Sequence, residues 1–333
     1  EPSFTQNWLI NCKHKIAKLI VQAREINKFH NTFLSSIMKY QVNGRIHAEI
    51  NQLRSDNGGT VSGRLSMSHP NLQQVPARNK EFGPLIRSLF IPDKGYKWGS
   101  FDYSQQEPRM TVHYAASIGD GYEGSNELVD AYQQASADFH QTVADLVGIE
   151  RVQAKTIGLG LMYGMGKNKL AQSLGVSKEE ADVLISKYNR KVPFVKLLSD
   201  RCMQTANDKG VIRTKKGRKC RFERWEPKDF GIHTAEIFDN AVAKYGRDNI
   251  KRAFTYKALN RLIQGSSADQ TKQAMLACAD AGYLPILQIH DELCFNVHDK
   301  DIDQIKTIME NCIEFKVPFV VDAKIGDSWG YAK

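Results

Sequence analysis

Closely paired cysteines are absent from this sequence. Its six cysteines lie far apart and form no Cys-x-x-Cys pair, which argues against a zinc cluster and against a disulfide framework. No stretch approaches the roughly 18 consecutive apolar residues of a membrane span, and the N-terminus lacks the pattern of a signal peptide. We therefore expect free thiols and a soluble protein that is not secreted. The chain starts at Glu1 without methionine, so we also expect a trimmed N-terminus.

The charge balance is basic. The chain has 46 Lys and Arg residues against 37 Asp and Glu residues, a formal net charge of +9. This excess favours a polyanionic partner, although charge alone makes nucleic acid no better than an even choice. The 333 residues exceed the roughly 250–300 at which a single core stops growing, so we expect one divided domain or several lobes.

Hydrophobic periodicity and the placement of Gly and Pro divide the chain into segments of different character. Strand candidates cluster near both ends and helices lie between them. A basic hairpin is indicated where eight of sixteen residues, 209–224, are Lys or Arg. We therefore expect a sheet built from both ends of the chain, with a helical lobe inserted. The predicted segments are helices over 4–38, 110–205 and 233–281, strands and loops over 44–100, two strands over 283–297 and one strand over 317–325.

Three separated patches can form one active site. In the first and third, an apolar run ends in carboxylates, Asp102 and the pair Asp291-Glu292. The second is a predicted helix with four residues at successive steps of four, which keeps them within roughly one third of its circumference. Two carboxylates can hold two divalent cations, and cations on a helix can hold a polyphosphate, so the combination suits phosphoryl transfer. The four helix residues are Arg151, Lys155, Leu159 and Tyr163.

Each patch also has a simpler structural explanation. Ser104 and Glu107 have the spacing of a capping box, and Asp291 suits a hairpin turn. The apolar strands flanking Asp291 weaken the second explanation, because acidic residues there carry a desolvation cost that bound cations would offset. For the helix with Arg151 the simpler explanation is an amphipathic helix whose basic face is solvated. Gly158 and Gly160, however, each cost up to about 1 kcal/mol inside a helix, which indicates close approach or bending.

Two further segments have the composition of nucleic-acid contacts. Residues 60–76 combine amides and arginine in a loop whose side chains can reach the groove edges of a duplex, although a plain hydrogen-bonded loop is the commoner case. The hairpin over 209–224 is typical of a solvated basic face. Its neighbours Phe222 and Trp225 can alternatively stack on bases.

Together these segments resemble the polymerase module of family A DNA polymerases, a bacterial and phage group. The likeness covers about 20–333, and its specificity comes from five motifs in family order. The residues similar to motif A are Asp102, Tyr103, Ser104, Gln105, Glu107 and Arg109; those similar to motif B are Arg151, Lys155, Tyr163 and Gly164; those similar to motif C are His290, Asp291 and Glu292. Residues 60–76 are similar to the duplex-contacting segment, and Asn260, Gln264 and Gly265 to the start of the next helix.

The resemblance implies an α+β, right-hand polymerase fold with an antiparallel palm sheet and a helical fingers insertion. The palm would consist of residues 44–111 and 257–333, and the fingers of residues 112–256. Residues 1–43 would be a partial thumb and entry helix, cut at its N-terminal side.

The resemblance also implies template-directed DNA synthesis, in which deoxynucleoside triphosphates are added to a primer 3′-hydroxyl by a two-metal mechanism with release of pyrophosphate. Asp102 and Asp291 would bind two Mg2+ ions, with Glu292 as an auxiliary acid and Lys155 as a proton donor to pyrophosphate. Glu107 would exclude a ribose 2′-hydroxyl. The nucleotide-binding residues would be Arg151, Lys155, Leu159, Tyr163, His140 and Glu107. The DNA-binding residues would be Arg64, Asn71, Gln74, Asn260, Gln264 and His290.

The implied partners are primer-template DNA and dNTPs, with no membrane. We expect a monomer in the cytoplasm of a bacterium or phage-infected host cell, with an upstream N-terminal region or a processivity partner as further contacts. Three residues depart from the family pattern. Leu159 stands where an aromatic residue is usual, Gly158 replaces a bulkier residue, and Pro108 replaces an aliphatic one.

Other functions remain open at this point. A single-subunit RNA polymerase resembles the family in its palm, but Glu107 and Glu292 speak against it. A catalytically silent DNA-binding fragment is disfavoured by retention of Asp102, Asp291 and the cationic helix. A metal-dependent nuclease would explain the acidic residues but not that helix.

Overall fold

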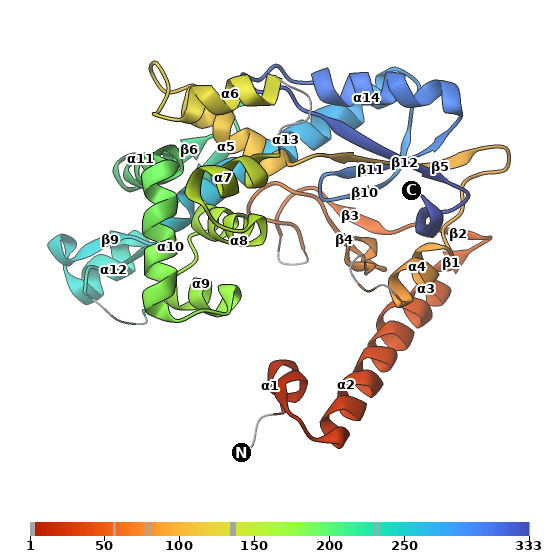
Figure 1. The fold of residues 1–333 in the computed structure, drawn as a ribbon, viewed down its shortest axis with the longest axis horizontal. Coiled ribbons are helices and arrows are strands. Elements are labelled where there is room, and N and C mark those ends of the chain that lie inside the picture. The colour runs from red at the N-terminus through yellow and green to blue at the C-terminus, as the bar shows by residue number, and fades with distance from the viewer. Residues whose placement is uncertain are drawn as a thin grey trace.

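The computed structural model describes residues 4–55, 58–76, 79, 81–133, 138–229, 231 and 233–332. Its sheet lies on one side of the molecule and most of its helices on the other, while helix α2 projects away from the body (Figure 1). None of the helices in the described residues has the length and apolar character that crossing a bilayer requires. All six cysteines carry free thiols.

The central sheet has four strands in the order β10-β11-β5-β12, and every neighbouring pair is antiparallel. The strands are β5 (Lys97–Tyr103), β10 (Pro285–Ile289), β11 (Glu292–Val297) and β12 (Val321–Gly326). The expectation of one sheet built from distant parts of the chain is therefore confirmed. Its two central strands, β5 and β11, are buried along most of their length.

Each face of the sheet covers a different hydrophobic core. Phe101 and Phe295 lie in the larger core, together with apolar residues of the helices behind the sheet. Trp98 and Cys294 lie in the smaller core on the opposite face, which the N-terminal segments and Trp329 complete. Helices that contribute to the larger core include α5 (Gln106–Ala116), α13 (Ala258–Asp280) and α14 (Ile302–Asn311).

The predicted helical insertion follows α5, which confirms the helical pattern over 110–205. Its helices have ordinary end signals: Ser177 and Glu180 form a capping box, and Gly210 ends the last helix with φ +66°. These helices are α6 (Ser125–Gln133), α7 (Phe139–Val147), α8 (Arg151–Met162), α9 (Lys167–Leu174), α10 (Lys178–Lys191) and α11 (Pro193–Lys209).

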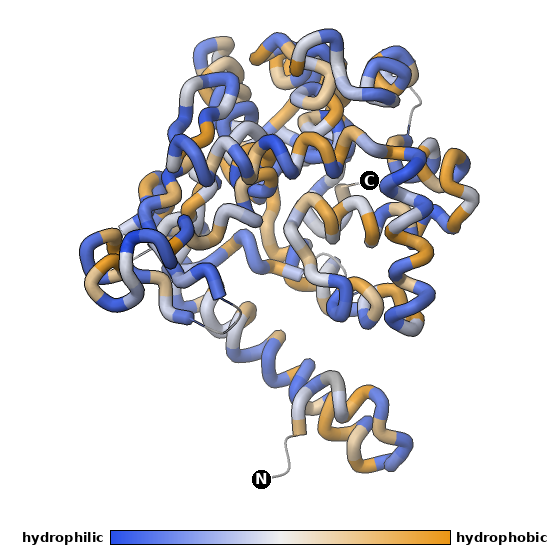
Figure 2. Tube along the Cα trace, turned by 90° about the vertical axis from the view of Figure 1, so that its left-hand side faces the viewer, coloured by the Kyte–Doolittle hydropathy of each residue, from blue (hydrophilic) through white to orange (hydrophobic). Residues whose placement is uncertain are grey.

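The N-terminal segment is helical, as expected, and most of its length is exposed. In Figure 2 it extends below the body with hydrophobic and hydrophilic residues interleaved along it. Ile16, Leu19 and Ile26 are more than half exposed at 58%, 54% and 54%. The segment comprises α1 (Gln6–Asn11), α2 (Lys15–Lys28), the π-helical turn η1 (Phe29–Leu34) and α3 (Ser35–Lys39).

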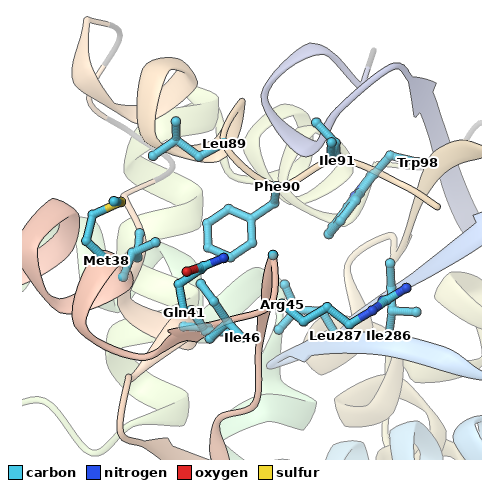
Figure 3. A pocket seen from close by; sticks show the side chains of 13 residues that line it. Met38, Gln41, Arg45, Ile46, Leu89, Phe90, Ile91, Trp98, Ile286 and Leu287 are labelled. Carbon is cyan, nitrogen blue, oxygen red and sulfur yellow. The ribbon is translucent and has the colours of Figure 1, made fainter. Parts of the chain in front are cut away.

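Short strands and turns connect this segment to β5. They border a groove with a volume of about 300 Å³, in which Met38, Leu89 and Ile286 surround Phe90 (Figure 3). The connecting elements are β1 (Gln41–Val42), β2 (Arg45–Ile46), β3 (Glu49–Asn51), β4 (Ser66–Ser68), the 3-10 turn η2 (Leu72–Gln74) and α4 (Phe82–Arg87).

The basic hairpin is confirmed as β6 (Val211–Arg213) and β7 (Lys219–Arg221). Phe222, however, is only 2% exposed and lies beneath the Arg261 guanidinium at 4.6 Å, so in this structure it has no face free for a base. Trp225 is likewise covered, because Phe238 and Arg252 pack against its ring.

The single helix predicted over 233–281 is wrong. A two-stranded ribbon, β8 (Trp225–Pro227) with β9 (Ile250–Arg252), brackets the short helix α12 (Phe238–Tyr245), and the long helix α13 begins only at Ala258. Gly246, at φ +81°, ends α12, and the pairing with β8 then takes the following residues into a strand. The remaining turns are η3 (Arg247–Asn249), η4 (Thr255–Lys257), η5 (Asp299–Asp301) and η6 (Trp329–Tyr331).

A buried ion pair fastens the basic hairpin to α13. Asp269 is 8% exposed and accepts hydrogen bonds from Arg218 Nε at 2.7 Å and from Thr214 Oγ1 at 2.7 Å. A Cβ atom at Gly63 would lie 2.5 Å from Arg218 Nη1, so the loop before β4 also packs against this guanidinium. Asp269 therefore links three segments that are distant in sequence.

We expect Asp269→Asn to lower the free energy of unfolding by about 3 kcal/mol, because it leaves the Arg218 charge without its partner in a mostly buried place. Asp200→Asn is the matched control: Asp200 pairs with Lys196 at 2.6 Å on the surface, where such pairs contribute about 0.5 kcal/mol or less. Chemical denaturation measures both variants. Equal losses in the two would contradict the anchoring role of Asp269.

Candidate active site

Carboxylates gather where β5 ends. Asp102 lies directly opposite Glu292 of β11 and Asp322 of β12. Residues directly opposite one another in antiparallel strands project to the same face. All three line one cavity of about 410 Å³, together with Arg87 and Lys324.

Asp291 completes this acidic group from the turn between β10 and β11. Ile289 pairs with Glu292, so His290 and Asp291 form a two-residue turn in which His290 has φ +57°. The amide of Tyr103 donates to the Asp291 carbonyl at 3.4 Å, which holds the turn beside the end of β5. The motif is thus both a hairpin turn and part of the site.

Crowding leaves this group with excess negative charge. Burial, and then the charges of Asp291, Glu292 and Asp322, raise the pKa of Asp102 to about 7, while Lys324 opposes the shift. Burial also raises the pKa of Asp291. The folded-state pKa of Asp102 exceeds its unfolded value, so stability contributed by this group falls as the pH rises from about 4 to 7. A bound cation would offset this cost.

The carboxylates of this site suit a magnesium ion that keeps some of its waters, not a metal ion that is bound by protein ligands alone. In the described residues, no group of three or more His, Cys, Asp or Glu side chains could by itself hold a metal ion. Mg2+ usually keeps several waters and binds one or two carboxylates together with substrate phosphates. Asp102 and Asp291 offer two such carboxylates, and burial raises the pKa of each because it disfavours the charged form.

Glu107 lies in the first turn of α5 but does not cap it. The helix follows Gln105, whose φ is +54° and whose side chain makes no capping bond, so the predicted capping box is wrong. The carboxylate of Glu107 instead accepts hydrogen bonds from Arg64, at 2.6 Å, and from the Tyr163 hydroxyl. These tertiary partners replace the local bond that the sequence pattern suggested.

Tyr163 joins this network to α13. Burial and the adjacent Glu107 charge raise its pKa, whereas a hydrogen bond with Gln264 lowers it. The sequence had placed Glu107 and Tyr163 with the nucleotide, and Arg64 and Gln264 with the DNA. The structure brings these four side chains together from four segments.

The four candidate residues at steps of four on α8, which we call the α8 stripe, begin with two cations in different surroundings. Arg151 donates to Asp138 Oδ2 through Nε at 3.0 Å and Nη2 at 2.5 Å. Lys155 is exposed and makes no hydrogen bond or ion pair with any described residue. Leu159 is half-buried and packs on the larger core, and Tyr163 follows the last residue of the helix. Lys155 is therefore the cation best placed to take a ligand without losing a partner.

His140 lies beneath this stripe and not on the surface. It is 4% exposed, and its Nδ1 has no partner among the described residues. Burial is the main cause that lowers its pKa to about 4; Asp138 opposes the shift, and Lys155 and Arg151 contribute to it. The imidazole is neutral at pH 7, and its role at the phosphates stays a prediction.

The predicted DNA-binding residues come from several separate segments of the chain. Asn71 accepts from the Gln73 amide at 3.2 Å and so begins η2, while Gln74 is exposed. Asn260 lies half-buried on α13, one turn before Gln264.

Sequence reasoning missed two supports of the site. Gln288 is 4% exposed in an otherwise apolar strand; it accepts from Gln73 at 2.9 Å and donates to the His290 carbonyl at 2.6 Å. Asp322 lies opposite Asp102 on β12. A polar residue inside a run as apolar as β10 was the available signal for Gln288. Nothing local marks Asp322.

The glycines of α8 provide close packing. A Cβ atom at Gly158 would lie 2.9 Å from the hydroxyl of Tyr188 on α10, and one at Gly160 would lie 3.0 Å from Leu170. Tyr188 is fully buried, and its hydroxyl has no partner among the described residues. Of the two explanations for these glycines, close approach is therefore the one that the contacts support.

We expect Gly158→Ala to lower the free energy of unfolding by about 1 kcal/mol, since the clash with Tyr188 outweighs the gain in helix propensity. In a Tyr188→Phe background the same change should be neutral or stabilising, because the hydroxyl is gone. Thermal unfolding of the four proteins of this cycle measures the coupling. Tyr96→Phe, at a ring 44% exposed, is the control for hydroxyl removal; additive effects of the two changes would contradict the contact.

The fold is similar to that of a solved polymerase domain. The structure aligns with the POL domain of Pol1 from M. smegmatis, solved in complex with DNA primer-template and dNTP, with a TM-score of 0.78 and 27% identity over 99% of this chain and 56% of that one. A family model described as DNA polymerase family A matches residues 2–331. The chain belongs to DNA polymerase family A.

Two relatives show how much of a longer protein the chain matches. A DNA-directed DNA polymerase of Pseudomonas phage M6 is 40% identical over all of this chain and 54% of its own length. DNA polymerase I of Pseudomonas aeruginosa is 32% identical over 96% of this chain and 34% of its own length. The chain thus spans about half the length of the phage relative and a third of the bacterial one.

Proposed function

We propose that this chain is the polymerase module of a template-directed DNA polymerase, which adds deoxynucleoside triphosphates to a primer 3′-hydroxyl and releases pyrophosphate. The observation that carries the proposal is the grouping of Asp102 and Asp291 at the end of the central sheet, within a family A fold. The lobes then follow as palm for residues 44–111 and 257–333, fingers for 112–256 and partial thumb for 1–43.

The acidic group supplies the metal sites of this proposal. Asp102 and Asp291 would hold two Mg2+ ions, which neutralise phosphate charge and favour ionisation of the primer hydroxyl when bound. Glu292 and Asp322 add negative charge beside Asp102. Their negative charges would strengthen the binding of cations next to the reacting phosphates.

The cations of α8 would bind the phosphates of the incoming nucleotide. Lys155 would hold the triphosphate and give a proton to the departing pyrophosphate, since it has no competing partner in the described residues. Arg151, oriented by Asp138, would bind the same phosphates with its remaining donors. The nucleotide phosphates would thus lie between the cations of α8 and the Mg2+ ions held by the carboxylates.

The Glu107 network would select the sugar and guide the DNA. Held by Arg64 and Tyr163, the Glu107 carboxylate has little freedom to move away from a ribose 2′-hydroxyl. Tyr163 would stack at the nascent base pair beside Leu159. The residues proposed to line the minor groove or primer end are Arg64, Asn71, Gln74, Asn260, Gln264 and His290.

The proposal is tested by extension of a labelled primer on a DNA template with Mg2+. Asp102→Ala and Asp291→Ala should each lower the rate at least about 100-fold, because a metal site contributes several kcal/mol to the transition state. Asp303→Ala, at an exposed acid in the first turn of α14, is the control and should retain the rate. Full activity of the Asp291 variant, or no extension by the unmodified chain, would overturn the proposal.

Sugar selection is tested with the same primer and both kinds of nucleotide. Glu107→Ala should raise rNTP use relative to dNTP use about tenfold or more, because the side chain proposed to exclude the 2′-hydroxyl is removed. Tyr163→Phe should give a smaller change in the same direction, since it frees Glu107 from one hydrogen bond. Tyr331→Phe, at a ring 59% exposed, is the control.

An unchanged rNTP-to-dNTP ratio in the Glu107 variant would contradict its role in sugar selection. A preference of the unmodified chain for rNTPs would shift the proposed function to RNA synthesis.

A further inference from the structure

A groove on the helical lobe shares no lining residue with the candidate active site. It lies between α11, the end of α5 and β6, and has a volume of about 340 Å³. In Figure 1, α11 and β6 lie toward the left of the molecule, whereas the strands of the central sheet are labelled toward the right. No step of the proposed function uses this groove.

The groove combines an apolar floor with a cationic rim. Leu198 and Leu262 are 2% and 6% exposed and belong to its floor. Arg201, Lys209 and Arg213 are exposed at its rim, and none of their three side chains makes a hydrogen bond or ion pair with a described residue. The described residues that line the groove include no aspartate or glutamate.

The rim charges come from two different elements. Leu198, Arg201, Thr205 and Lys209 follow one another at steps of three and four on α11, so they share one face of that helix. Arg213 extends from the end of β6 in the basic hairpin. The cations therefore border the apolar floor from both walls, and a ligand seated there meets positive charge on both sides.

These features fit an acidic peptide better than a nucleic acid. Proteins that bind single strands without sequence preference offer aromatic platforms beside their cations. Tyr114 is the aromatic residue of this lining, and its hydroxyl is held by Ser266 at 2.6 Å and by the Lys215 amide at 2.9 Å. A phosphate backbone would also leave the apolar floor unfilled. An acidic peptide segment with an apolar side chain would fill the apolar floor and pair with the cations of the rim.

We propose that this groove binds an acidic peptide segment of a partner protein, with an apolar side chain on the floor and carboxylates against Arg201, Lys209 and Arg213. Such a segment can be disordered when free and ordered only at its anchor, which suits transient recruitment. The proposal goes beyond DNA synthesis and does not depend on it.

The test uses fluorescence polarisation of a labelled short peptide of alternating Asp and Glu that ends in two leucines, with the 333-residue chain. The peptide should bind, and replacement of its leucines by serines should weaken binding about tenfold or more, because the apolar anchor is lost. The double variant Arg201→Glu with Arg213→Glu should weaken it by a similar factor. Lys187→Glu, at an exposed lysine of α10, is the matched control.

Two further measurements distinguish a peptide-binding groove from a surface used in DNA synthesis and from a nonspecific basic patch. Primer extension by the double variant should match that of the unmodified chain, which separates this groove from the proposed function. A single-stranded oligothymidine should not compete with the peptide. Equal binding of the leucine and serine peptides, or complete competition by the oligothymidine, would overturn the proposal in favour of a nonspecific basic patch for polyanions.

Discussion

The register of β5 between β11 and β12 is the constraint on which the site depends. It sets Asp102 opposite both Glu292 and Asp322 and brings the Asp291 turn against the end of the strand. A slip of one residue would turn Asp102 toward the core and Phe101 toward the cavity, so burial of both sheet faces fixes the chemistry as well as the fold. The cost of this arrangement is crowded negative charge, expressed in the raised pKa of Asp102.

The Glu107 network ties this strand end to the rest of the molecule. Its members come from the loop before β4, from α5, from the end of α8 and from α13. The Asp269 ion pair holds the basic hairpin to the same α13. The long helix α13 therefore contacts both the basic hairpin and Tyr163. It is a common support for the hairpin and for the Glu107 network.

Much of this arrangement was predictable because its signals are local. Asp102 and Asp291 each end an apolar run, and the α8 stripe follows the helical period. Asp322 was not predictable, because its meaning comes from a cross-strand neighbour more than 200 positions away in the chain. The capping box failed for the same reason: Arg64 and Tyr163 outcompete the local amides for Glu107. The helix predicted over 233–281 failed because pairing of β8 with β9 overrode helical periodicity.

Asp138 has two tasks whose combination has a mechanical consequence. It accepts from the His140 and Gln141 amides to begin α7, and it holds Arg151 at the start of α8. A rotation of α8 that kept this ion pair would have to move α7 as well. Asp138 therefore couples the two helices, so that they move as one rigid unit. Arg151 at the start of α8 and the first turn of α7 would then move together, so a displacement of one helix would also displace the other.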